Sequence, residues 1–434
     1  MEKELSSKTT NSRRRFLAQS AILSAFFIVP RHVLGRGFVP PSDKVTLGFI
    51  GAGRQGLDLR NSFHSMAPDA QIVAVSDVFQ AKMDALVAQV NASYAGRNGQ
   101  ETYKGCKPFA DFRELLRQPD IDAVVIATPD HWHAAQVVRA AEAGKDIYCE
   151  KPLSLTVYEG RAMIKAVRRH KRILQTGSMQ RSWPEFRQAV ELVRNGYIGE
   201  VRTIKINVGG PPVPYNLSEE PIPVNLDWDK WLGPNAFSPY NHLIAPLMMF
   251  DYYAKWRDYR EFGGGGMTDW GAHMFDIAQW ALDMDRKGPI SVTPPNGNEV
   301  QVLTYRYENG VIMTREKFGD SPGVQFNGTK GSIEVHRGHI ATNPNELAQR
   351  KIADNEQRVY FSDNHYKDFL RSVKSRTQPL CDVETGHRTA TVCNIGNIAY
   401  ALNKPLQWDY THEKFNDAAA DSLLKRTMRK EYAV

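Results

Sequence analysis

A glycine-rich fingerprint near the start of the chain limits what this sequence can fold into. The hexapeptide Gly51-Ala52-Gly53-Arg54-Gln55-Gly56 has the form G-x-G-x-x-G and directly follows an apolar run at 45–50. After a strand, the first glycine permits a tight turn, the second lets the backbone approach a pyrophosphate, and the third allows close helix–strand packing. The helix that begins here presents N–H groups to the phosphates. We therefore expect Gly51, Gly53, Arg54, Gln55 and Gly56 to bind a dinucleotide.

The region from 43 to 176 alternates short apolar runs with amphipathic helical stretches. The expected strands lie at 45–50, 71–76, 123–127, 146–149 and 173–176, and the expected helices at 78–90, 133–143 and 157–170. This alternation is typical of a doubly wound parallel sheet. The predicted fold class is α/β, with a Rossmann-type NAD-binding domain at 43–176.

Asp77 ends the second expected strand, 21 positions after Gly56. A carboxylate there accepts hydrogen bonds from the adenosine ribose hydroxyls and repels a 2′-phosphate, so NAD(H) is favoured over NADP(H). The alternative is that Asp77 only caps the helix that follows. The glycine fingerprint favours the cofactor-binding interpretation.

The pattern changes after residue 176. Segments expected to be regular are a helix at 184–195, a strand at 201–208, a helix at 267–284, β segments at 300–307, 311–318, 324–327 and 332–336, and a late helix at 386–402 that packs back on the body. Residues 177–410 are therefore predicted to form an α+β domain with an open, mainly antiparallel sheet. Residues 411–434 are expected to form a C-terminal tail.

The first 35 residues are expected to be an export signal rather than part of the fold. Residues 12–17 read S-R-R-R-F-L, which matches the twin-arginine pattern, and a moderately apolar run at 18–29 and a small residue, Gly35, follow. The apolar run is too short to span a membrane. We expect the twin-arginine machinery to export the folded protein, with its cofactor bound, to the periplasm.

The charge balance argues against nucleic-acid binding. Residues 1–35 contain six basic and two acidic side chains, so they carry four of the chain's seven net positive charges. The small remainder does not make an electrostatic footprint for nucleic acid. The four cysteines form no C-x-x-C pair, and His131 and His133 have no third ligand nearby in sequence, so we expect no metal site.

Two polar clusters follow expected strands of the first domain, at the sheet edge where cofactors bind. Thr128, Pro129 and His133 follow one strand, and Glu150 and Lys151 follow the next. We expect these five residues to contact the cofactor. The Lys151 ammonium could also polarise a substrate hydroxyl, although a lysine before a helix is more often simply exposed.

A second pair of candidates lies in the expected helix 267–284. Asp269 and His273 are spaced i, i+4, so a continuous helix would place them on one face, where Asp269 could orient His273. A neutral His273 could take a proton from an alcohol, and Asp276 could orient its ring from the other side. On spacing alone, an ordinary helix-face ion pair is the favoured interpretation.

The combination of motifs resembles one known family. The fingerprint, Glu150-Lys151-Pro152, the glycine run 263–266 with Asp269 and His273, and a Gly-Thr-Lys-Gly-Ser segment at 328–332 occur in the order typical of Gfo/Idh/MocA oxidoreductases. The resemblance implies that Lys151, Asp269 and His273 line the nicotinamide and a sugar or cyclitol. It also implies that the second sheet mediates dimers or tetramers.

Additional substrate contacts are expected outside these motifs. Arg181 is one candidate, and Trp228, Trp231 and Tyr240 could stack on sugar rings, or equally could pack a long loop. Similarity of the segment 226–234 to exported family members thought to act on glycosides extends the substrate class to glycosides.

The leading prediction is an exported NAD(H)-dependent dehydrogenase of a sugar, glycoside or cyclitol, with His273 as base and Lys151 and Asp269 positioning the hydroxyl. One alternative is a redox-neutral NAD-dependent glycosidase, in which transient oxidation at the sugar C3 permits elimination. The sequence Met-Thr-Asp-Trp-Gly-Ala-His at 267–273 differs from the Tyr-Pro-Thr-His type of those enzymes. The other alternative is a non-catalytic periplasmic sugar-binding protein, which the presence of Lys151 and His273 disfavours.

Overall fold

The structure, a computed structural model, describes residues 43–98, 101–247 and 254–434. Residues 45–434 form one compact unit. The predicted export signal at 1–35 lies outside the described residues. Among the described helices, none combines the length and the apolar character that crossing a bilayer would require.

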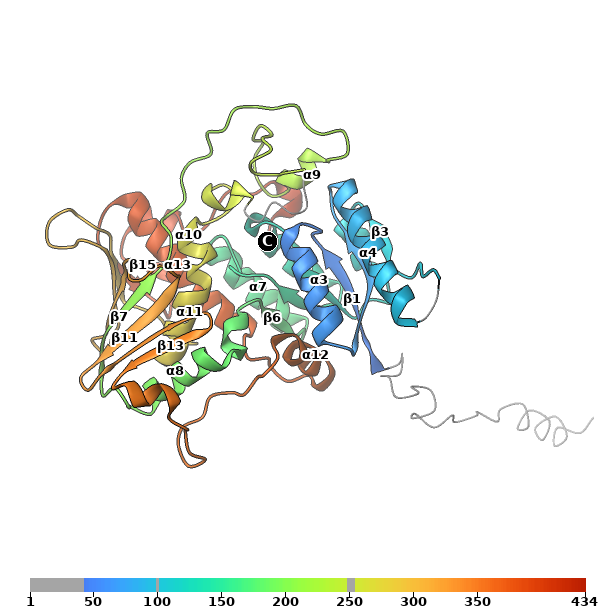
Figure 1. Cartoon of the computed structure of the whole chain (residues 1–434). Coiled ribbons are helices and arrows are strands. Elements are labelled where there is room, and N and C mark those ends of the chain that lie inside the picture. The colour runs from blue at the N-terminus through green and yellow to red at the C-terminus, as the bar shows by residue number, and fades with distance from the viewer. Residues whose placement is uncertain (1–42, 99–100, 248–253) are drawn as a thin grey trace, which may run out of the picture. The chain divides into compact units, whose positions relative to one another are not determined.

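The first half of this unit is a six-stranded sheet in which all neighbouring strands are parallel. Its spatial order is β3 (Lys107–Phe109), β2 (Ala70–Ser76), β1 (Val45–Ile50), β4 (Ala123–Ile126), β5 (Asp146–Cys149) and β6 (Leu174–Thr176). The order reverses between β1 and β4, and a crevice for ligands opens at the carboxyl ends of the strands at such a switch point. The predicted doubly wound sheet is confirmed (Figure 1).

Helices cover both faces of this sheet, which is why its strands read as continuous apolar runs. The covering helices are α3 (Arg54–Met66), α4 (Gln80–Asn98), α5 (Phe112–Leu116), α6 (His133–Glu142), α7 (Val157–Arg169) and, from much later in the chain, α12 (His365–Ser375). Successive strand residues enter different cores: Phe49 packs in one cluster and Ile50 in the other. Strand β3 was not predicted, because it is only three residues long and Lys107 and Pro108 are exposed.

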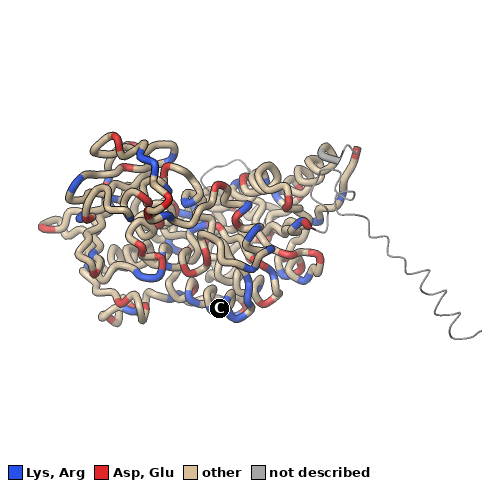
Figure 2. The backbone as a smooth tube through the Cα atoms, turned by 90° about the horizontal axis from the view of Figure 1, so that it is seen from below, with Lys and Arg blue, Asp and Glu red and all other residues tan. Residues whose placement is uncertain are grey.

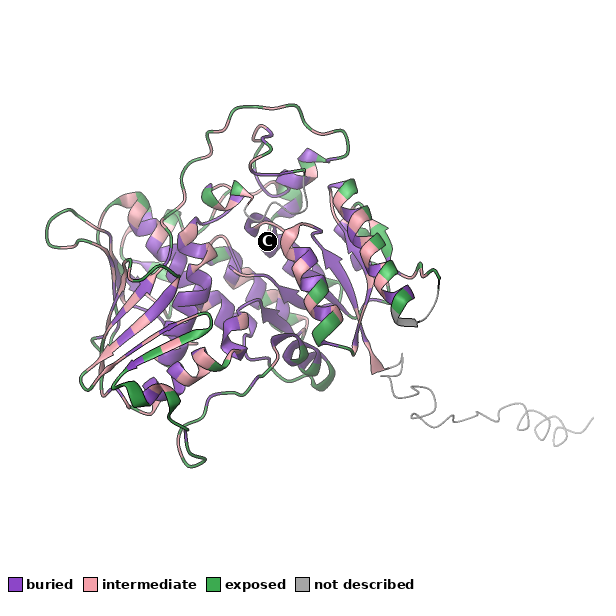
Figure 3. Cartoon of the chain, viewed as in Figure 1, coloured by how far each residue is buried: buried purple, intermediate pink, exposed green. Residues whose placement is uncertain are grey.

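The second half contains a nine-stranded sheet of the predicted open type. Its spatial order is β13 (His339–Asn343), β12 (Ser332–His336), β11 (Gly323–Gly328), β7 (Val201–Asn207), β10 (Ile312–Arg315), β9 (Leu303–Arg306), β8 (Ser291–Thr293), β14 (Leu406–Asp409) and β15 (Lys414–Phe415). Only the β7–β10 pair is parallel. Side chains such as Ile204 and Phe326 are buried on the helix-covered face, while their neighbours along each strand are only partly buried (Figure 3).

Three helices form the layer beneath this sheet: α8 (Pro184–Arg194), α11 (Gly271–Ala281) and α13 (Val383–Leu402). Helix α13 begins where the side chain of Asp382 accepts a hydrogen bond from the Thr385 N–H. It contacts α7 and β6 of the first half and also α11 and β8 of the second. The predicted late helix therefore packs against both sheets.

The structure corrects two sequence predictions. The single helix expected at 267–284 is divided at Trp270 into α10 (Gly266–Asp269) and α11, although Trp270 itself keeps right-handed helical backbone angles. Residues 411–434 are not a loose tail, since they include β15, α14 (Ala418–Ser422) and the short helix η6 (Lys430–Tyr432).

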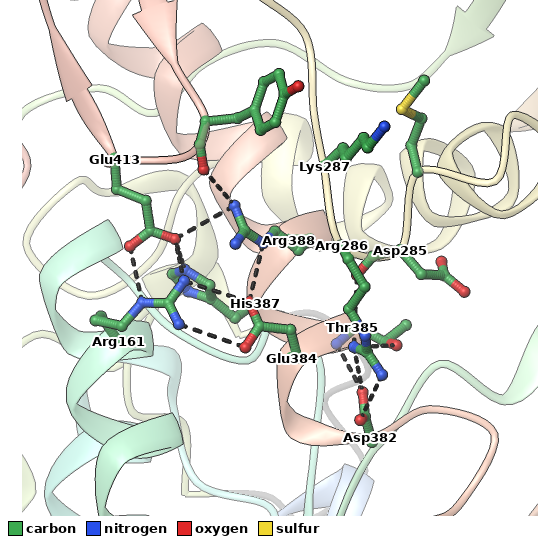
Figure 4. A network of polar contacts seen from close by, with 12 residues as sticks. Arg161, Asp285, Arg286, Lys287, Asp382, Glu384, Thr385, His387, Arg388 and Glu413 are labelled. Carbon is green, nitrogen blue, oxygen red and sulfur yellow. Dashed lines mark hydrogen bonds and ion pairs between the residues drawn. The ribbon is translucent and has the colours of Figure 1, made fainter.

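Charged residues are dispersed along the described chain, with Lys and Arg intermingled with Asp and Glu (Figure 2). One partly buried network fastens the chain after β14 to the body (Figure 4). Glu413 pairs there with Arg161 of α7, whose Nε lies 2.9 Å from Oε2, and with His387 of α13. Arg388 of α13 donates to the backbone oxygen of Tyr410 at 2.6 Å.

Candidate active site

A cleft of about 1330 Å³, including space open to solvent, lies at the carboxyl edge of the parallel sheet. Residues from the ends of β1, β2, β4 and β5 line it, together with residues from the segment 230–257 and the C-terminus. The sequence-predicted residues found in its wall are Gly51, Gly53, Arg54, Gln55, Asp77, Thr128, Pro129, Glu150, Lys151, Trp231 and Asp269. The structure thus brings most of the predicted site to one place.

The three fingerprint glycines are required for different reasons. Gly51 has φ +100°, and a Cβ there would lie 2.7 Å from the Ala127 oxygen. A Cβ on Gly56 would lie 2.2 Å from the Gly51 oxygen. Gly53 precedes α3 and lies in the wall of the cleft. A Cβ on Gly53 would have no other atom within 4 Å. The space above Gly53 therefore fits the close approach of a pyrophosphate to the backbone.

This difference predicts that two glycine substitutions have separable effects. We expect Gly53→Val to leave the urea midpoint of the apoprotein unchanged and to weaken NAD⁺ binding about tenfold or more, equivalent to about 1.4 kcal/mol. Gly56→Ala should instead lower the free energy of unfolding by about 1–3 kcal/mol, because its new methyl overlaps backbone. Urea titration and calorimetric binding measure the two quantities. Equal NAD⁺ affinity of Gly53→Val and wild type would contradict the assignment.

The position of Asp77 is compatible with both roles considered for it, cofactor binding and capping of the following helix. Its Oδ2 accepts a hydrogen bond from the Ala52 N–H at 2.6 Å, and its Oδ1 accepts one from the Phe79 N–H at 2.8 Å. Burial raises the pKa of its carboxyl, and the hydrogen bond from Ala52 opposes that rise. Asp77 therefore braces the glycine loop while remaining in the wall of the cleft.

Glu150 ties the glycine loop to the strand end that carries Lys151. Its Oε1 accepts a hydrogen bond from the Gln55 side chain at 3.0 Å, and its Oε2 accepts one from the Lys151 backbone N–H at 3.2 Å. Glu150 is almost fully buried, and burial raises the pKa of its carboxyl. The pair Glu150–Gln55 therefore fixes the position of the Lys151 backbone relative to the fingerprint.

Lys151 and Asp269 form the polar centre of the cleft. Lys151 Nζ donates to both the backbone oxygen and the Oδ1 of Asp269, each at 2.8 Å. Arg257 Nε lies 3.4 Å from the same Oδ1. Burial raises the pKa of the Asp269 carboxyl, but the two facing cations outweigh burial and lower it to about 2. Asp269 is therefore a carboxylate throughout the neutral pH range, and Lys151 retains a third N–H for another acceptor.

His273 is placed differently from its sequence-based prediction. It is buried, it is not in the wall of the cleft, and its Nε2 lies 3.2 Å from Nη2 of Arg337. A guanidinium can only donate, so Nε2 accepts and the proton is on Nδ1. Nδ1 has no hydrogen-bond partner among the described residues. Burial, Lys151 and Arg337 lower the pKa of the imidazole well below its ordinary value.

Neither of the two expected partners of His273 forms a hydrogen bond with it in the described chain. The hydrogen bonds of Asp269 in the described chain go to Lys151 rather than to His273. Asp276 was wrongly expected to orient the ring: its carboxylate binds Arg181 at 2.7 and 2.8 Å and the Thr389 hydroxyl at 2.8 Å. The expected role of His273 as a base therefore loses its support, because Arg337 occupies the lone pair of Nε2.

Arg181 is also wrong as a substrate contact. It is fully buried, and besides Asp276 it binds both oxygens of Asp285, at 2.9 and 2.7 Å. It follows β6 at the carboxyl edge, but its side chain points to Asp276 of α11 and to Asp285 in the loop after it. Arg181 is a structural residue of the interior.

The aromatic candidates divide between the cleft and a separate core. Trp228 stacks on Trp231 with ring centroids 4.7 Å apart, and Tyr240 packs edge-on against Trp228. Of the three, only Trp231 lines the cleft. Trp228 and Tyr240 are buried in the core of the segment 215–262, so the loop-packing alternative holds for these two residues.

His133 likewise serves the scaffold. Its Nδ1 lies 2.9 Å from the Pro152 oxygen and its Nε2 lies 3.1 Å from the Thr128 oxygen, so it links the two loops that carry cofactor candidates. It is buried and is not in the cleft wall. The expectation of a direct cofactor contact by His133 is therefore corrected to an indirect role.

Sequence analysis missed several residues of the cleft wall, among them Asp130, Arg257 and Tyr432. Asp130 is buried in the wall of the cleft, and burial raises the pKa of its carboxyl well above the ordinary value. Its position two residues after Thr128 could have indicated it. Arg257 and Tyr432 reach the cleft from distant parts of the chain, and no local pattern marks them.

Comparison with known proteins agrees with the observed fold. Residues 45–178 match the Gfo/Idh/MocA model described as oxidoreductase family, NAD-binding Rossmann fold, and residues 210–434 match that family's C-terminal alpha/beta domain. The chain is 24% identical to myo-inositol 2-dehydrogenase of Thermotoga maritima over 387 residues, which covers 83% of this chain and 96% of that protein. It is 25% identical to a glycosyl hydrolase family 109 protein of Stenotrophomonas maltophilia, covering 74% and 73% of the two chains.

A solved structure shares the fold. The WlbA dehydrogenase from Bordetella pertussis in complex with NADH and UDP-GlcNAcA superposes with a TM-score of 0.59 at 16% identity, covering 84% of this chain and 98% of that one. With both family models matched and both sheets present in the expected topology, the chain belongs to the Gfo/Idh/MocA family of NAD-binding oxidoreductases.

Proposed function

We propose that this oxidoreductase is an exported, NAD(H)-dependent dehydrogenase that acts on a hydroxyl-bearing carbon of a sugar, glycoside or cyclitol. The observation that carries the proposal is the Lys151–Asp269 pair, which lies in the same cleft as the glycine fingerprint. The inositol dehydrogenase relative supports a polyhydroxylated substrate. The twin-arginine pattern at 13–14 supports export to the periplasm.

The residues of the cleft have distinct roles in this proposal. The glycine loop and the N-terminus of α3 hold the pyrophosphate, and Asp77 holds the adenosine ribose. Bound NAD⁺ supplies the hydride acceptor. Lys151 uses its third N–H to bind the substrate hydroxyl and lowers that hydroxyl's pKa. Asp269 keeps the ammonium in place through its two hydrogen bonds.

His273 does not take the predicted base role in this proposal. Its Nε2 accepts from Arg337, its Nδ1–H is buried, and the residue lies outside the cleft wall. The Lys151 ammonium instead stabilises the alkoxide, and the substrate proton leaves to the solvent that reaches the cleft.

The preference for NAD(H) over NADP(H) gives a specific expectation. Asp77→Ser removes the charge that would repel a 2′-phosphate but retains an acceptor for the Ala52 N–H. We expect the ratio of NADP⁺ to NAD⁺ affinity to rise about tenfold or more, since like charges in contact cost more than about 1.4 kcal/mol. Asp111→Ser, which removes another carboxylate from the same cleft, should leave the ratio unchanged. Equal ratios in the two variants would contradict the role of Asp77.

The first test of the function is to purify the mature protein, denature it, and identify any released nucleotide by mass spectrometry. Released NAD(H) would support loading of the cofactor before export. Sugars, glycosides and cyclitols are then screened for a change in nicotinamide absorbance and for hydride transfer between two sugars. A protein that holds no nucleotide and binds no added NAD(H) would exclude the dehydrogenase and favour the sugar-binding alternative.

The second candidate is a redox-neutral glycosidase, favoured by the family 109 relative. It would cleave an aryl glycoside with a catalytic amount of NAD⁺ and no net reduction. A dehydrogenase would instead form one NADH for each sugar oxidised. The same purified protein therefore distinguishes the two functions by product stoichiometry.

The oligomeric state is a further part of the proposal. Family resemblance favours a dimer or tetramer formed through the open face of the nine-stranded sheet. Light scattering of the purified protein measures it directly, and a monomer would remove this part of the proposal.

A further inference from the structure

The last twelve residues, 423–434, form a segment that we call the C-terminal strap. Its Arg429 holds α9 (Trp228–Leu232): Nη1 and Nη2 lie 2.6 and 2.8 Å from Asp229 Oδ1 and the Asp229 backbone oxygen, and Nε lies 2.6 Å from the Gly233 oxygen. The Arg429 N–H also donates to the Pro234 oxygen at 2.9 Å. Four hydrogen bonds from one residue thus connect the strap to the end of α9. Figure 1 shows the C-terminus close to α9.

Arg426 fastens the same strap to the parallel-sheet half. Its Nε and Nη2 lie 3.0 and 2.8 Å from Oε1 of Glu159, and Nη2 also lies 2.7 Å from the His131 oxygen. Glu159 is buried in the first turn of α7, so its charge needs a partner. The strap therefore connects α9 to the first half of the molecule through buried or partly buried polar contacts.

Tyr432 is the residue of the strap that lines the cleft. It is 6% exposed and belongs to the cleft wall. Its ring packs edge-on against Trp132 with centroids 5.0 Å apart at 82°, and the Arg113 guanidinium lies 5.0 Å from its centroid. The third residue from the end of the sequence thus lines the same cleft as Gly51.

The strand order places Tyr432 along the cleft. Lys151 follows β5, whereas Asp77 follows β2 on the other side of the β1–β4 switch point. Arg113, which stacks on Tyr432, follows β3, beyond β2. A dinucleotide whose pyrophosphate crosses the glycine loop has its adenosine half on the β2–β3 side. Tyr432 therefore lies at the adenosine end of the cleft, away from Lys151.

We propose that Tyr432 is a cofactor-binding residue that walls the adenosine half of the nucleotide, and that the C-terminal strap slows nucleotide release. The strap holds α9, which contributes Lys230 and Trp231 to the same cleft. Release of the nucleotide then requires the strap and α9 to move apart. This inference rests on the NAD(H) binding of the proposed function, but not on the identity of the sugar.

The test uses the full mature protein with Tyr432→Ala, Tyr432→Phe and, as a control in the same strap, Leu423→Ala. Leu423 is 41% exposed and is not in the cleft wall. Nucleotide release is measured by stopped-flow displacement of bound NADH with excess NAD⁺. We expect Tyr432→Ala to release NADH about tenfold faster, because changes at one interface act mainly on dissociation rates. Tyr432→Phe and Leu423→Ala should release it at the wild-type rate.

A second measurement locates the effect within the cleft. ADP-ribose and nicotinamide mononucleotide compete separately for the site, and Tyr432→Ala should weaken binding of ADP-ribose while binding of nicotinamide mononucleotide stays constant. Equal weakening of the two, or a release rate equal to wild type, would overturn the proposal. If Tyr432→Ala does not fold, Arg429→Gln removes the side-chain hydrogen bonds to Asp229 and Gly233 while every residue of the cleft wall is retained, and it should still accelerate NADH release.

These outcomes separate the inference from the proposed function. Faster NADH release from Tyr432→Ala, with no oxidation of any sugar, would support the proposed role of the strap and exclude the dehydrogenase function. Sugar oxidation with an unchanged rate of NADH release would support the dehydrogenase function and exclude the proposed role of the strap. A wild-type protein that binds neither NAD⁺ nor ADP-ribose would overturn both.

Discussion

Replacing Lys151 with Met is expected to lower kcat by about 10²- to 10³-fold, the usual effect of removing one group that stabilises a developing negative charge. Methionine has about the length of the lysine stem but cannot bind a hydroxyl or stabilise the alkoxide formed from it. Asp269 does not become an unpaired buried charge in this variant, because Arg257 remains 3.4 Å from its Oδ1. The loss should therefore come from the chemical step rather than from collapse of the site.

The measurement is single-turnover reduction of bound NAD⁺ by the substrate found in the sugar screen, together with the dissociation constant for NAD⁺. The matched control is Lys230→Met, because Lys230 also lines the cleft but pairs with Asp227 at 2.9 Å, away from Asp269. The control should keep kcat within a few-fold of wild type. A Lys151→Met enzyme with wild-type kcat would show that another group stabilises the alkoxide.

Replacing Arg181 with Met should lower the free energy of unfolding by about 3–5 kcal/mol, as expected when one partner of a buried ion pair is removed. Arg181 is fully buried between Asp276 and Asp285, so its loss leaves the buried Asp276 carboxylate without its cation. Asp285, in contrast, keeps the influence of Arg194 and Arg286. Burial already raises the pKa of Asp276 despite the facing guanidinium. Without that guanidinium, the folded-state pKa of Asp276 rises further above its unfolded value, and the stability of the variant should increase as pH falls.

Urea unfolding between pH 5 and 8 tests both statements. Arg202→Met is the control, because its ion pair with Glu200 is exposed and such pairs contribute little. If Arg181 contacted substrate, its replacement would raise KM at wild-type stability, and that result would contradict the structural role.

The fold was predictable from the sequence because its signals are local. The apolar runs of β1, β4 and β5 are continuous because both faces of the sheet are covered, and the fingerprint needs only six consecutive residues. Strand ends also place Asp77 and Lys151 on the correct edge of the sheet. Sequence spacing does not indicate the direction in which a side chain points. Arg181 follows a strand at the same edge of the sheet, but its side chain points into the interior.

The rest of the site depends on contacts between distant segments. Asp269 and His273 have the spacing of one helix turn, yet the helix is divided between them. Asp269 accepts a hydrogen bond from Lys151, whereas His273 accepts one from Arg337. Tyr432 and Arg257 come from segments with no recognisable motif. Such pairings are set by tertiary packing, which a single sequence does not report.

Helix α12 places a limit on how this protein can be divided. Tyr366, Phe369 and Leu370 of α12 share a core cluster with Phe63 of α3, although some 300 residues separate them in sequence. The outer layer of the parallel sheet is thus encoded at the far end of the gene. A recombination event, or an engineered chimera, that exchanges the nucleotide-binding module between relatives would therefore have to transfer α12 together with residues 45–178.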